Sequence, residues 1–358
     1  MKISTRQICF IMFTYTAVGK LLLYPTFLSL GCGRDLLLPA FINFFISGII
    51  VWSLSFLASR TEKTFFGLLE GTFGNVFARI IYALFAVMFL FAALLPLFEQ
   101  KQYIHAIFYD TTPSLTVFLP FFVFSVYAAS KKFTNIGRCA DICFPIFVVC
   151  MAALLGMSFS EVDWGNLMPM FRTPAKNIFE TALGTVSAFV EPCWLLMFLG
   201  HFKYKKGDAA KITLSYAGAA ALVLLFLATF YGIYGAITPS RTFAIARTSL
   251  FFSAIETMGR IDLILLFIME IVMLFALVLN IQLAVHCIGE VLNVKDYKII
   301  SLLVNIALVA VIVFADNKSN AVLKVYSQWL WIMFLVFTVL IPVLCWTLKR
   351  RGNEGRTR

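Results

Sequence analysis

The sequence predicts an all-α integral membrane protein, and three observations lead to this fold class. Of the 358 residues, 61% are hydrophobic and only 13% are charged, whereas soluble domains have about 45–50% apolar and about 25% charged residues. The apolar residues form long runs without alternation, which disfavours a β-barrel. At roughly 20 residues per span, the chain accommodates about ten transmembrane helices with short connections. No room is left for a soluble catalytic domain.

Ten apolar stretches, each bounded by charged or turn residues, give the expected spans. They lie at about 8–30, 36–58, 79–104, 114–130, 138–159, 177–200, 211–236, 260–292, 298–315 and 325–348. The fifth is interrupted only by Asp141 and Pro145. We expect one membrane domain over 1–358, with a first repeat at about 1–159, a second at about 177–348 and a short basic tail at 349–358.

The distribution of Lys and Arg predicts the orientation. With the N-terminus inside, the inner segments carry about twice as many of these residues as the outer ones. This bias favours cytoplasmic termini at both ends, which requires an even number of spans. The net charge of +11 therefore reflects topology, and it does not predict nucleic acid binding.

Soluble chemistry has little support in the sequence. The eight cysteines are scattered through the spans, without the spacing of a zinc site or a disulfide framework. The three histidines, His105, His201 and His286, lie near expected helix ends. The sequence contains no GxGxxG motif, no P-loop and no Ser/His/Asp constellation. We expect no catalytic residues, no metal and no cofactor, and hence no enzyme.

Lys20 lies about midway along the first expected span, which makes it a costly residue in a bilayer. Gly19 precedes it and Pro25 follows, and both residue types weaken a helix and free backbone polar groups. Such groups are tolerated at membrane depth where they line a cavity. Two interpretations stay open: a broken helix whose ends and ammonium group meet a carboxylate ligand, or a proline kink with Lys20 neutralised by a structural acid.

Glu191-Pro192 marks a second interruption, in the sixth expected span, after the small-residue run 184–188. Because span six is span one plus five, the two breaks occupy corresponding places in two five-helix halves. Paired breaks of this kind indicate a substrate site at the midplane of an inverted repeat. The sequence leaves open whether Glu191 pairs with Lys20, binds a ligand amine, takes a proton or serves another helix.

Three further polar positions lie in expected spans. Asn280, deep in the eighth, shares a helical face with Ala276; together they suit either a pocket wall or helix–helix packing. Glu270 lies on the opposite side of that helix and suits a cation path or an inter-subunit contact. Glu99 and Lys101 close the third span, where we expect interfacial anchors or else an outer gate.

The connections give weaker predictions. The basic cluster at 203–206 and the tail at 349–351 are expected to anchor the cytoplasmic face, with anionic lipid binding as the lesser role. The two longest outer connections, at about 160–176 and 237–259, either cap the outer mouth or form short interfacial helices.

Several short motifs occur in order along the whole chain. They are Ile3-Ser4-Thr5-Arg6-Gln7, Gly19, Pro25, Gly33-Arg34-Asp35, Thr112-Pro113, Asn166-Leu167-Met168-Pro169, Glu191 with its following basic loop, Gly259-Arg260-Ile261-Asp262 and Leu348-Lys349-Arg350-Arg351. Their order and spacing resemble the spore germination permease family of the GerAB type. The resemblance implies the amino acid–polyamine–organocation superfamily, with a leucine-transporter-type 5+5 inverted repeat.

The resemblance also implies a role. Family members are B subunits of nutrient germinant receptors in the spore inner membrane, with a larger membrane A subunit and a lipoprotein C subunit as partners. By position, Ala17, Val18, Gly19 and Lys20 match the small-residue break that receives the ligand, although the family usually has a small residue in place of Lys20. Ala276 and Asn280 match the eighth-span wall, and Glu191 matches an acid of the sixth span.

We therefore expect a multi-pass protein of the cell or spore inner membrane that binds a small nutrient, an amino acid, and helps trigger germination. Backbone groups at Val18, Gly19, Ser187 and Ala188 are expected to hold its carboxylate and amine, with Lys20 and Glu191 tuning charge. One alternative is a proton- or sodium-coupled amino acid permease, which the same pocket serves. Another is a structural or channel-forming subunit without a ligand.

Overall fold

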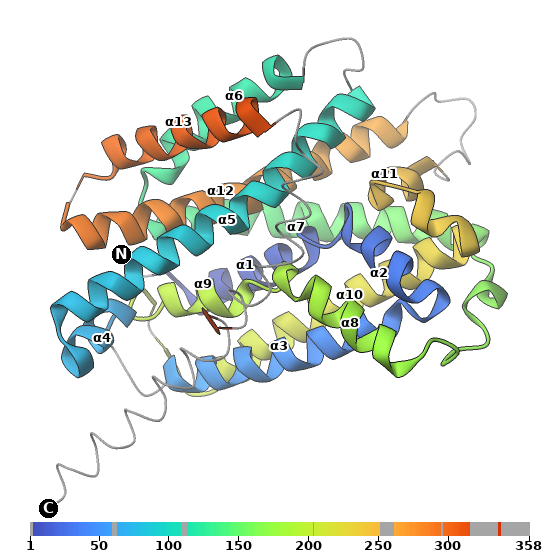
Figure 1. Ribbon diagram of the computed structural model, residues 1–358, viewed down its shortest axis with the longest axis horizontal. Coiled ribbons are helices and arrows are strands. Elements are labelled where there is room, and N and C mark those ends of the chain that lie inside the picture. The colour runs from blue at the N-terminus through green and yellow to red at the C-terminus, as the bar shows by residue number, and fades with distance from the viewer. Residues whose placement is uncertain are drawn as a thin grey trace, which may run out of the picture.

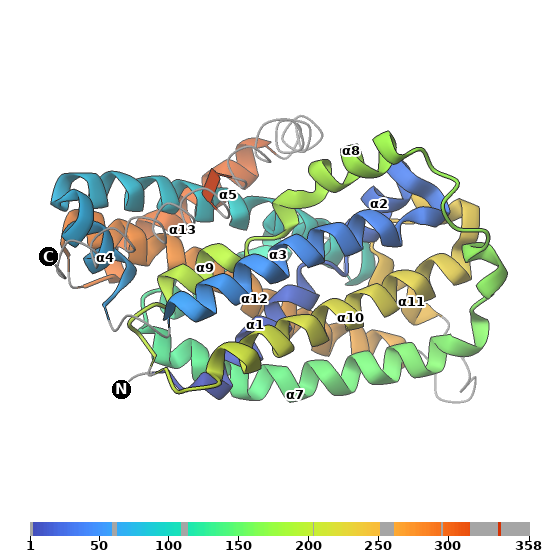
Figure 2. The same ribbon diagram turned by 90° about the horizontal axis from the view of Figure 1, so that it is seen from below.

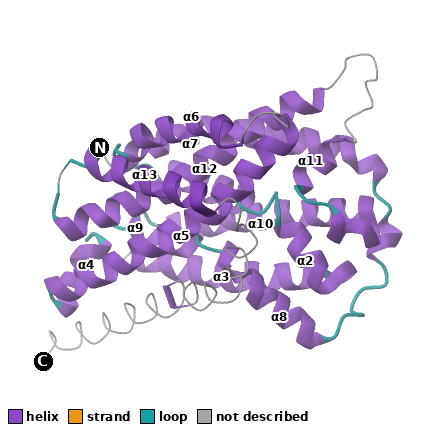
Figure 3. Cartoon of the chain, turned by 45° about the horizontal axis from the view of Figure 1, so that its top comes forward, coloured by secondary structure: helices purple, strands orange, loops and turns teal. Residues whose placement is uncertain are grey.

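The computed structural model describes residues 3–58, 63–108, 114–202, 204–250, 261–294, 296–315 and 336–337. Within these ranges the regular structure is helical, and β-pairing is limited to an isolated bridge between Ile3 and Phe202 (Figures 1 and 3). The predicted all-α fold is confirmed. A helix satisfies its own backbone hydrogen bonds, which is what a chain this apolar requires in a bilayer.

The first half of the chain contains seven helices within the described ranges. They are α1 (Thr5–Val18), α2 (Tyr24–Cys32), α3 (Leu37–Ala58), α4 (Phe65–Phe73), α5 (Asn75–Phe108), α6 (Ser114–Ala129) and α7 (Phe133–Ser158). The short 3₁₀ turn η1 (Gly33–Asp35) joins α2 to α3. The first predicted span, 8–30, is thus two helices, and α4 is an additional short helix between the second and third predicted spans.

The second half is described as far as the ninth predicted span. Its helices are α8 (Ala175–Thr185), α9 (Glu191–Met197), α10 (Asp208–Tyr234), α11 (Ala244–Ser249), α12 (Ile261–Leu292) and α13 (Lys298–Ala315). Its 3₁₀ turns are η2 (Phe159–Glu161), η3 (Trp164–Leu167), η4 (Val186–Ala188) and η5 (Gly235–Ser240). The sixth predicted span, 177–200, is again two helices. Apart from 336–337, the tenth predicted span lies outside the described residues, as do the tail and the motifs at 112–113 and 259–260, so the count of ten and the repeat boundaries stay predictions.

Five of the described segments are long and apolar enough to cross a bilayer. They are Leu37–Phe56, Asn75–Ile107, Phe133–Glu161, Asp208–Ser240 and Asp262–Leu292. The outer faces of the helices carry large apolar side chains such as Phe45, Val123 and Leu303, each at least 60% exposed. Contact of these apolar side chains with lipid tails has no free-energy cost, whereas their contact with water is unfavourable. The chain is a multi-pass membrane protein.

The helices pack around α1, which runs through the middle of the molecule and contacts α7, α10 and α12. On one side α12 packs along α5, and α6 and α13 cover them; on the other side α10 packs against α3 (Figure 1). Helices α2 and α8 lie side by side (Figure 2). A Cβ atom at Gly31 of α2 would come within 2.1 Å of the Thr181 hydroxyl of α8, so a glycine is required for this close approach.

Candidate functional site

The first helix break lies between Gly19 and Pro25, where the sequence left open a broken helix or a proline kink. Helix α1 ends at Val18 with Gly19 as its C-cap, and α2 begins at Tyr24 with the proline in its first turn. In a continuous helix the carbonyl groups of Leu21 and Leu22 would accept hydrogen bonds from N–H groups one turn later. Here they accept hydrogen bonds of 3.1 and 3.0 Å from the N–H groups of Ile245 and Ala244. The α11 segment thus satisfies part of the backbone that the break exposes.

The second break lies between α8 and α9. Helix α8 ends at Thr185, the turn η4 follows, and α9 begins at Glu191 with Pro192 in its first turn. Proline is well suited to the start of a helix, because its missing N–H would be unpaired there in any case. All seven residues of α9 are buried. Both breaks lie midway between the two ends of the molecule (Figure 2).

Lys20 and Glu191 join the two breaks directly. The Lys20 Nζ lies 2.5 Å from Glu191 Oε1 and donates a second hydrogen bond of 3.1 Å to the Thr16 carbonyl. The ring of Phe189 lies 4.3 Å from the ammonium group. Lys20 is 1% exposed and Glu191 is 0% exposed. The sequence left several roles open for Glu191, and the structure contains one of them, the ion pair with Lys20.

A cavity of about 640 Å³ lies next to the breaks and reaches the surface beside α8. Its mouth is marked by the exposed side chains of Asn177 and Glu180. Three elements supply the deeper walls: the α1–α2 break with Tyr15, Gly19 and Tyr24, the α8–α9 break with Thr185, Ser187 and Ala188, and α5 with Ala92, Pro96 and Glu99. Both interrupted helices therefore contribute to a single cavity.

A helical hydrogen bond missing from α5, beside the cavity, explains the position of Asn280. Pro96 has no N–H, so the Ala92 carbonyl, four residues earlier in α5, lacks its helical hydrogen bond. The Asn280 side chain donates to that carbonyl at 3.2 Å. Its own oxygen accepts a hydrogen bond of 2.7 Å from the Tyr15 hydroxyl. Asn280 thus holds Tyr15 and α5 in place from behind the cavity wall.

The predicted ligand-binding residues fall into three groups. Gly19, Ser187 and Ala188 line the cavity. Lys20, Glu191 and Asn280 are buried beside it and are hydrogen-bonded to other residues. Ala17, Val18 and Ala276 are buried residues outside the cavity lining within the described part of the chain.

The structure shows the surroundings of two polar residues of α5, which the sequence did not. Glu99, expected to be an interfacial anchor or gate, lines the cavity. Gln100, the next residue, is 4% exposed and faces Glu270 of α12, which is 5% exposed. With its amide nitrogen toward the carboxylate, Gln100 lies 2.5 and 2.8 Å from the two Glu270 oxygens. Ala92, Pro96 and Glu99 are spaced by four and three residues, which places them on one face of a helix. This spacing is the feature of the sequence from which their common position on the cavity wall could have been predicted.

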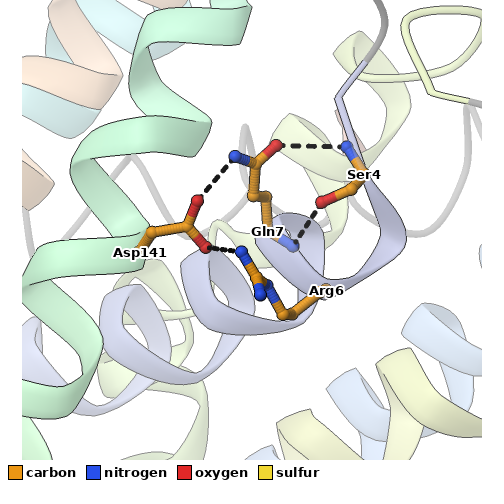
Figure 4. A network of polar contacts seen from close by, with 4 residues as sticks. All are labelled: Ser4, Arg6, Gln7 and Asp141. Atoms are coloured by element: carbon orange, nitrogen blue, oxygen red, sulfur yellow. Dashed lines mark hydrogen bonds and ion pairs between the residues drawn. The ribbon is translucent and has the colours of Figure 1, made fainter.

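At the N-terminal end of the molecule, α1 is held to α7 by a polar network that we call the N-terminal clamp (Ser4, Arg6, Gln7 and Asp141; Figure 4). Ser4 and Gln7 form a capping box, which closes the first turn of α1. Asp141 accepts hydrogen bonds from Arg6 at 3.0 Å and from Gln7 at 2.7 Å. The start of α1, which carries this network, lies at the end of the molecule opposite the start of α8 (Figure 2).

At the mouth end, Asp35 fixes the connection that precedes α8. Its carboxylate accepts hydrogen bonds of 2.7 to 2.9 Å from the backbone N–H groups of Phe171, Arg172 and Thr173. Burial alone would raise the pKa of Asp35, but these hydrogen bonds stabilise the charged form and hold the pKa below its ordinary value. The motif Gly33-Arg34-Asp35 thus has a structural role at the edge of the membrane segment.

A family model described as spore germination protein matches residues 2–322. The chain belongs to the spore germination protein (spore permease) family. A search of curated protein sequences finds no match.

Solved structures confirm the fold of this spore germination family member. It resembles Mhp1, a nucleobase-cation-symport-1 family transporter, in a closed conformation with bromovinylhydantoin bound; the TM-score is 0.57 at 13% identity, over 91% of this chain and 78% of that one. The inward-facing conformation of Mhp1 gives a TM-score of 0.57 at 12% identity, over 94% and 73%. The protein is therefore a transporter-like membrane protein of the germination family.

Proposed function

We propose that this protein is the nutrient-binding B subunit of a germinant receptor and that it binds an amino acid in the cavity between its two broken helices. The observation that carries the proposal is the meeting of both breaks, through Gly19, Ser187 and Ala188, at one cavity of about 640 Å³. Ligand pockets for small molecules commonly enclose about 300–1,000 Å³. Irregular backbone at membrane depth is tolerated where it lines such a site.

The cavity wall supplies the polar groups that a small zwitterion needs. Ser187 and Thr185 contribute hydroxyl groups. A bound carboxylate or amine would pair with these hydroxyl groups and with the backbone groups near Gly19.

Ligand binding would act by shifting a conformational equilibrium. A ligand shifts an equilibrium only as far as it binds one state better than the other. Because Lys20 and Glu191 join the two breaks, a ligand that contacts both would favour one relative position of α1–α2 and α8–α9. The change would then reach an A-type membrane subunit and a C-type lipoprotein, the partners implied by the germinant-receptor role.

The second candidate function is a proton- or sodium-coupled amino acid permease. It is favoured by the likeness of the fold to Mhp1, which is a cation-symport family transporter. A sensor and a permease share the cavity and differ in whether the ligand crosses the membrane.

The test compares two glycine variants of the purified full chain in proteoliposomes. Gly184 lines the cavity, and a Cβ atom there would have no neighbour within 4 Å, so Gly184→Leu fills the cavity without displacing the wall. Gly156 of α7 has equally open surroundings but does not line the cavity, and Gly156→Leu is the matched control. We expect binding of a labelled amino acid mixture to be lost in the first variant and kept in the second.

Uptake under imposed pH and Na⁺ gradients separates the two candidates. Binding without accumulation supports the receptor subunit, and co-purification with A- and C-type subunits from the host membrane would support it further. Gradient-driven accumulation supports the permease. Equal amino acid binding by Gly184→Leu and the wild type would remove the cavity from both proposals.

A further inference from the structure

The cavity lining is acidic in the part of the chain that the structure describes. Two carboxylate residues, Glu99 and Glu180, contribute to its lining, while no Lys, Arg or His residue in the described ranges does so. Glu180 belongs to the exposed mouth, where its carboxylate lies 3.8 Å from the Lys176 ammonium. Glu99 is the deeper of the two, on the same face of α5 as Ala92 and Pro96.

Glu99 is not neutralised by a neighbouring cation. Its carboxylate forms no hydrogen bond and no ion pair with any described residue. Lys101, two residues later, projects from a different side of α5 because residues two apart in a helix do not face each other, and its buried side chain does not line the cavity. Ionisable residues in membrane segments are costly and are usually paired or functional.

The ammonium group of Lys20, which lies between the two breaks, is already engaged. Lys20 donates to Glu191 and to the Thr16 carbonyl, and its side chain is 1% exposed. A ligand carboxylate therefore meets hydroxyl and backbone groups in the cavity, whereas a ligand ammonium meets the charge of Glu99. Hydrogen bonds with a charged partner are stronger than neutral ones.

From this arrangement we propose that Glu99 binds the ammonium group of the ligand, so that the site selects for a primary amine and tolerates loss of the carboxylate. This inference rests on the proposed ligand-binding function and specifies its chemical class. The favoured ligands are amino acids, their amides and small primary amines. Carboxylic acids of the same size without an amino group are excluded, because they would place a second negative charge beside Glu99.

The test measures binding to the purified full chain in nanodiscs. The probes are the labelled amino acid mixture and labelled ethanolamine, each in competition with matched compounds: alanine, alaninamide, ethylamine, propionate and lactate. The variants are Glu99→Gln and Glu270→Gln. The second is the control, because Glu270 is also a carboxylate in a membrane segment but lies against Gln100, outside the cavity lining.

We expect the amines and amino acids to compete with the probes in the wild type, and propionate and lactate not to compete. Glu99→Gln should weaken amine-dependent binding about tenfold or more, while Glu270→Gln should leave it within about twofold. Elution of each variant at the wild-type position in size-exclusion chromatography checks the fold.

The outcomes separate this inference from the proposed function. Amino acid binding of equal affinity in Glu99→Gln and the wild type, or equal competition by propionate and alanine, would overturn the role of Glu99 and leave the proposed function standing. Glu99-dependent binding of ethanolamine without amino acid binding would keep the role of Glu99 and overturn the amino acid as ligand. If neither probe bound to the wild type, both the role of Glu99 and the proposed function would be overturned.

Discussion

At the scale of single residues, the ion pair of Lys20 and Glu191 determines how the two broken helices fit together. Both side chains are almost fully buried, so each charge depends on the other for compensation. Removing one member of a buried pair leaves an unpaired charge and costs about 3–5 kcal/mol, whereas replacing both is far less harmful. The pair thus acts as a joint between the breaks as much as a source of stability.

The first prediction concerns this pair. Lys20→Met should destabilise the protein by about 3–5 kcal/mol, because Glu191 is left without its cation. The double variant Lys20→Met/Glu191→Gln should recover most of that loss. The measurement is unfolding of the purified protein in detergent, followed by circular dichroism. A double variant as unstable as the sum of the two single variants would show that the residues are not coupled.

The sequence predicted some site residues and missed others for a physical reason. Gly19 and Pro192 act on their own backbone, so their effect on a helix is visible locally, and both breaks were predicted. The direction of a side chain such as Glu99 depends on which neighbour packs against each face of its helix. Asn280 was a candidate for the pocket wall, and its actual place depends on the carbonyl that Pro96 leaves free in another helix.

At the scale of elements, α1 is fixed at its two ends by different means. Its C-terminal end meets α9 through the buried ion pair, and its N-terminal end is held to α7 by the N-terminal clamp. Thr5 adds a hydrogen bond of 2.6 Å to Asp208 at the start of α10. These contacts fix the start of α1 to α7 and α10.

A second prediction tests the N-terminal clamp. Asp141→Ala should increase hydrogen exchange in the first turns of α1, because Gln7 loses the carboxylate that it contacts at 2.7 Å. Arg6→Ala should have a smaller effect, since the Arg6 side chain is 68% exposed and exposed ion pairs contribute about 0–1 kcal/mol. Hydrogen exchange with mass spectrometry provides the comparison. Equal protection in Asp141→Ala and the wild type would mean that other contacts hold this end of α1.

The third prediction concerns the connection held by Asp35. A carboxyl group whose pKa is lowered on folding stabilises the fold above its unfolded pKa, and this contribution is lost as the pH falls through the folded value. Asp35→Asn should therefore lower the free energy of unfolding at neutral pH by about 1–3 kcal/mol, and the melting temperature with it. The difference from the wild type should shrink as the pH falls below 3.8, the ordinary Asp value. A difference that persists in acid would assign the effect to shape rather than charge.

At the scale of the whole molecule, the fold has two distinct ends. The start of α8, whose Asn177 and Glu180 line the cavity, lies at one end, and the start of α1 lies at the other (Figure 2). The excess of Lys and Arg in the inner segments predicts that the clamp end is cytoplasmic. If so, the cavity faces the outer side of the membrane, from which a nutrient arrives.

The last prediction tests this orientation with single cysteines in a chain without its native ones. A cysteine replacing Asn177, which is exposed at the mouth, should react with a membrane-impermeant maleimide in intact cells. A cysteine replacing Lys206, exposed in the connection before α10, should react only after the membrane is opened. The reverse pattern would place the cavity mouth in the cytoplasm. A nutrient receptor would then have to sense a ligand that had already entered the cell, which would favour the permease alternative working in the export direction or a sensor of internal metabolites.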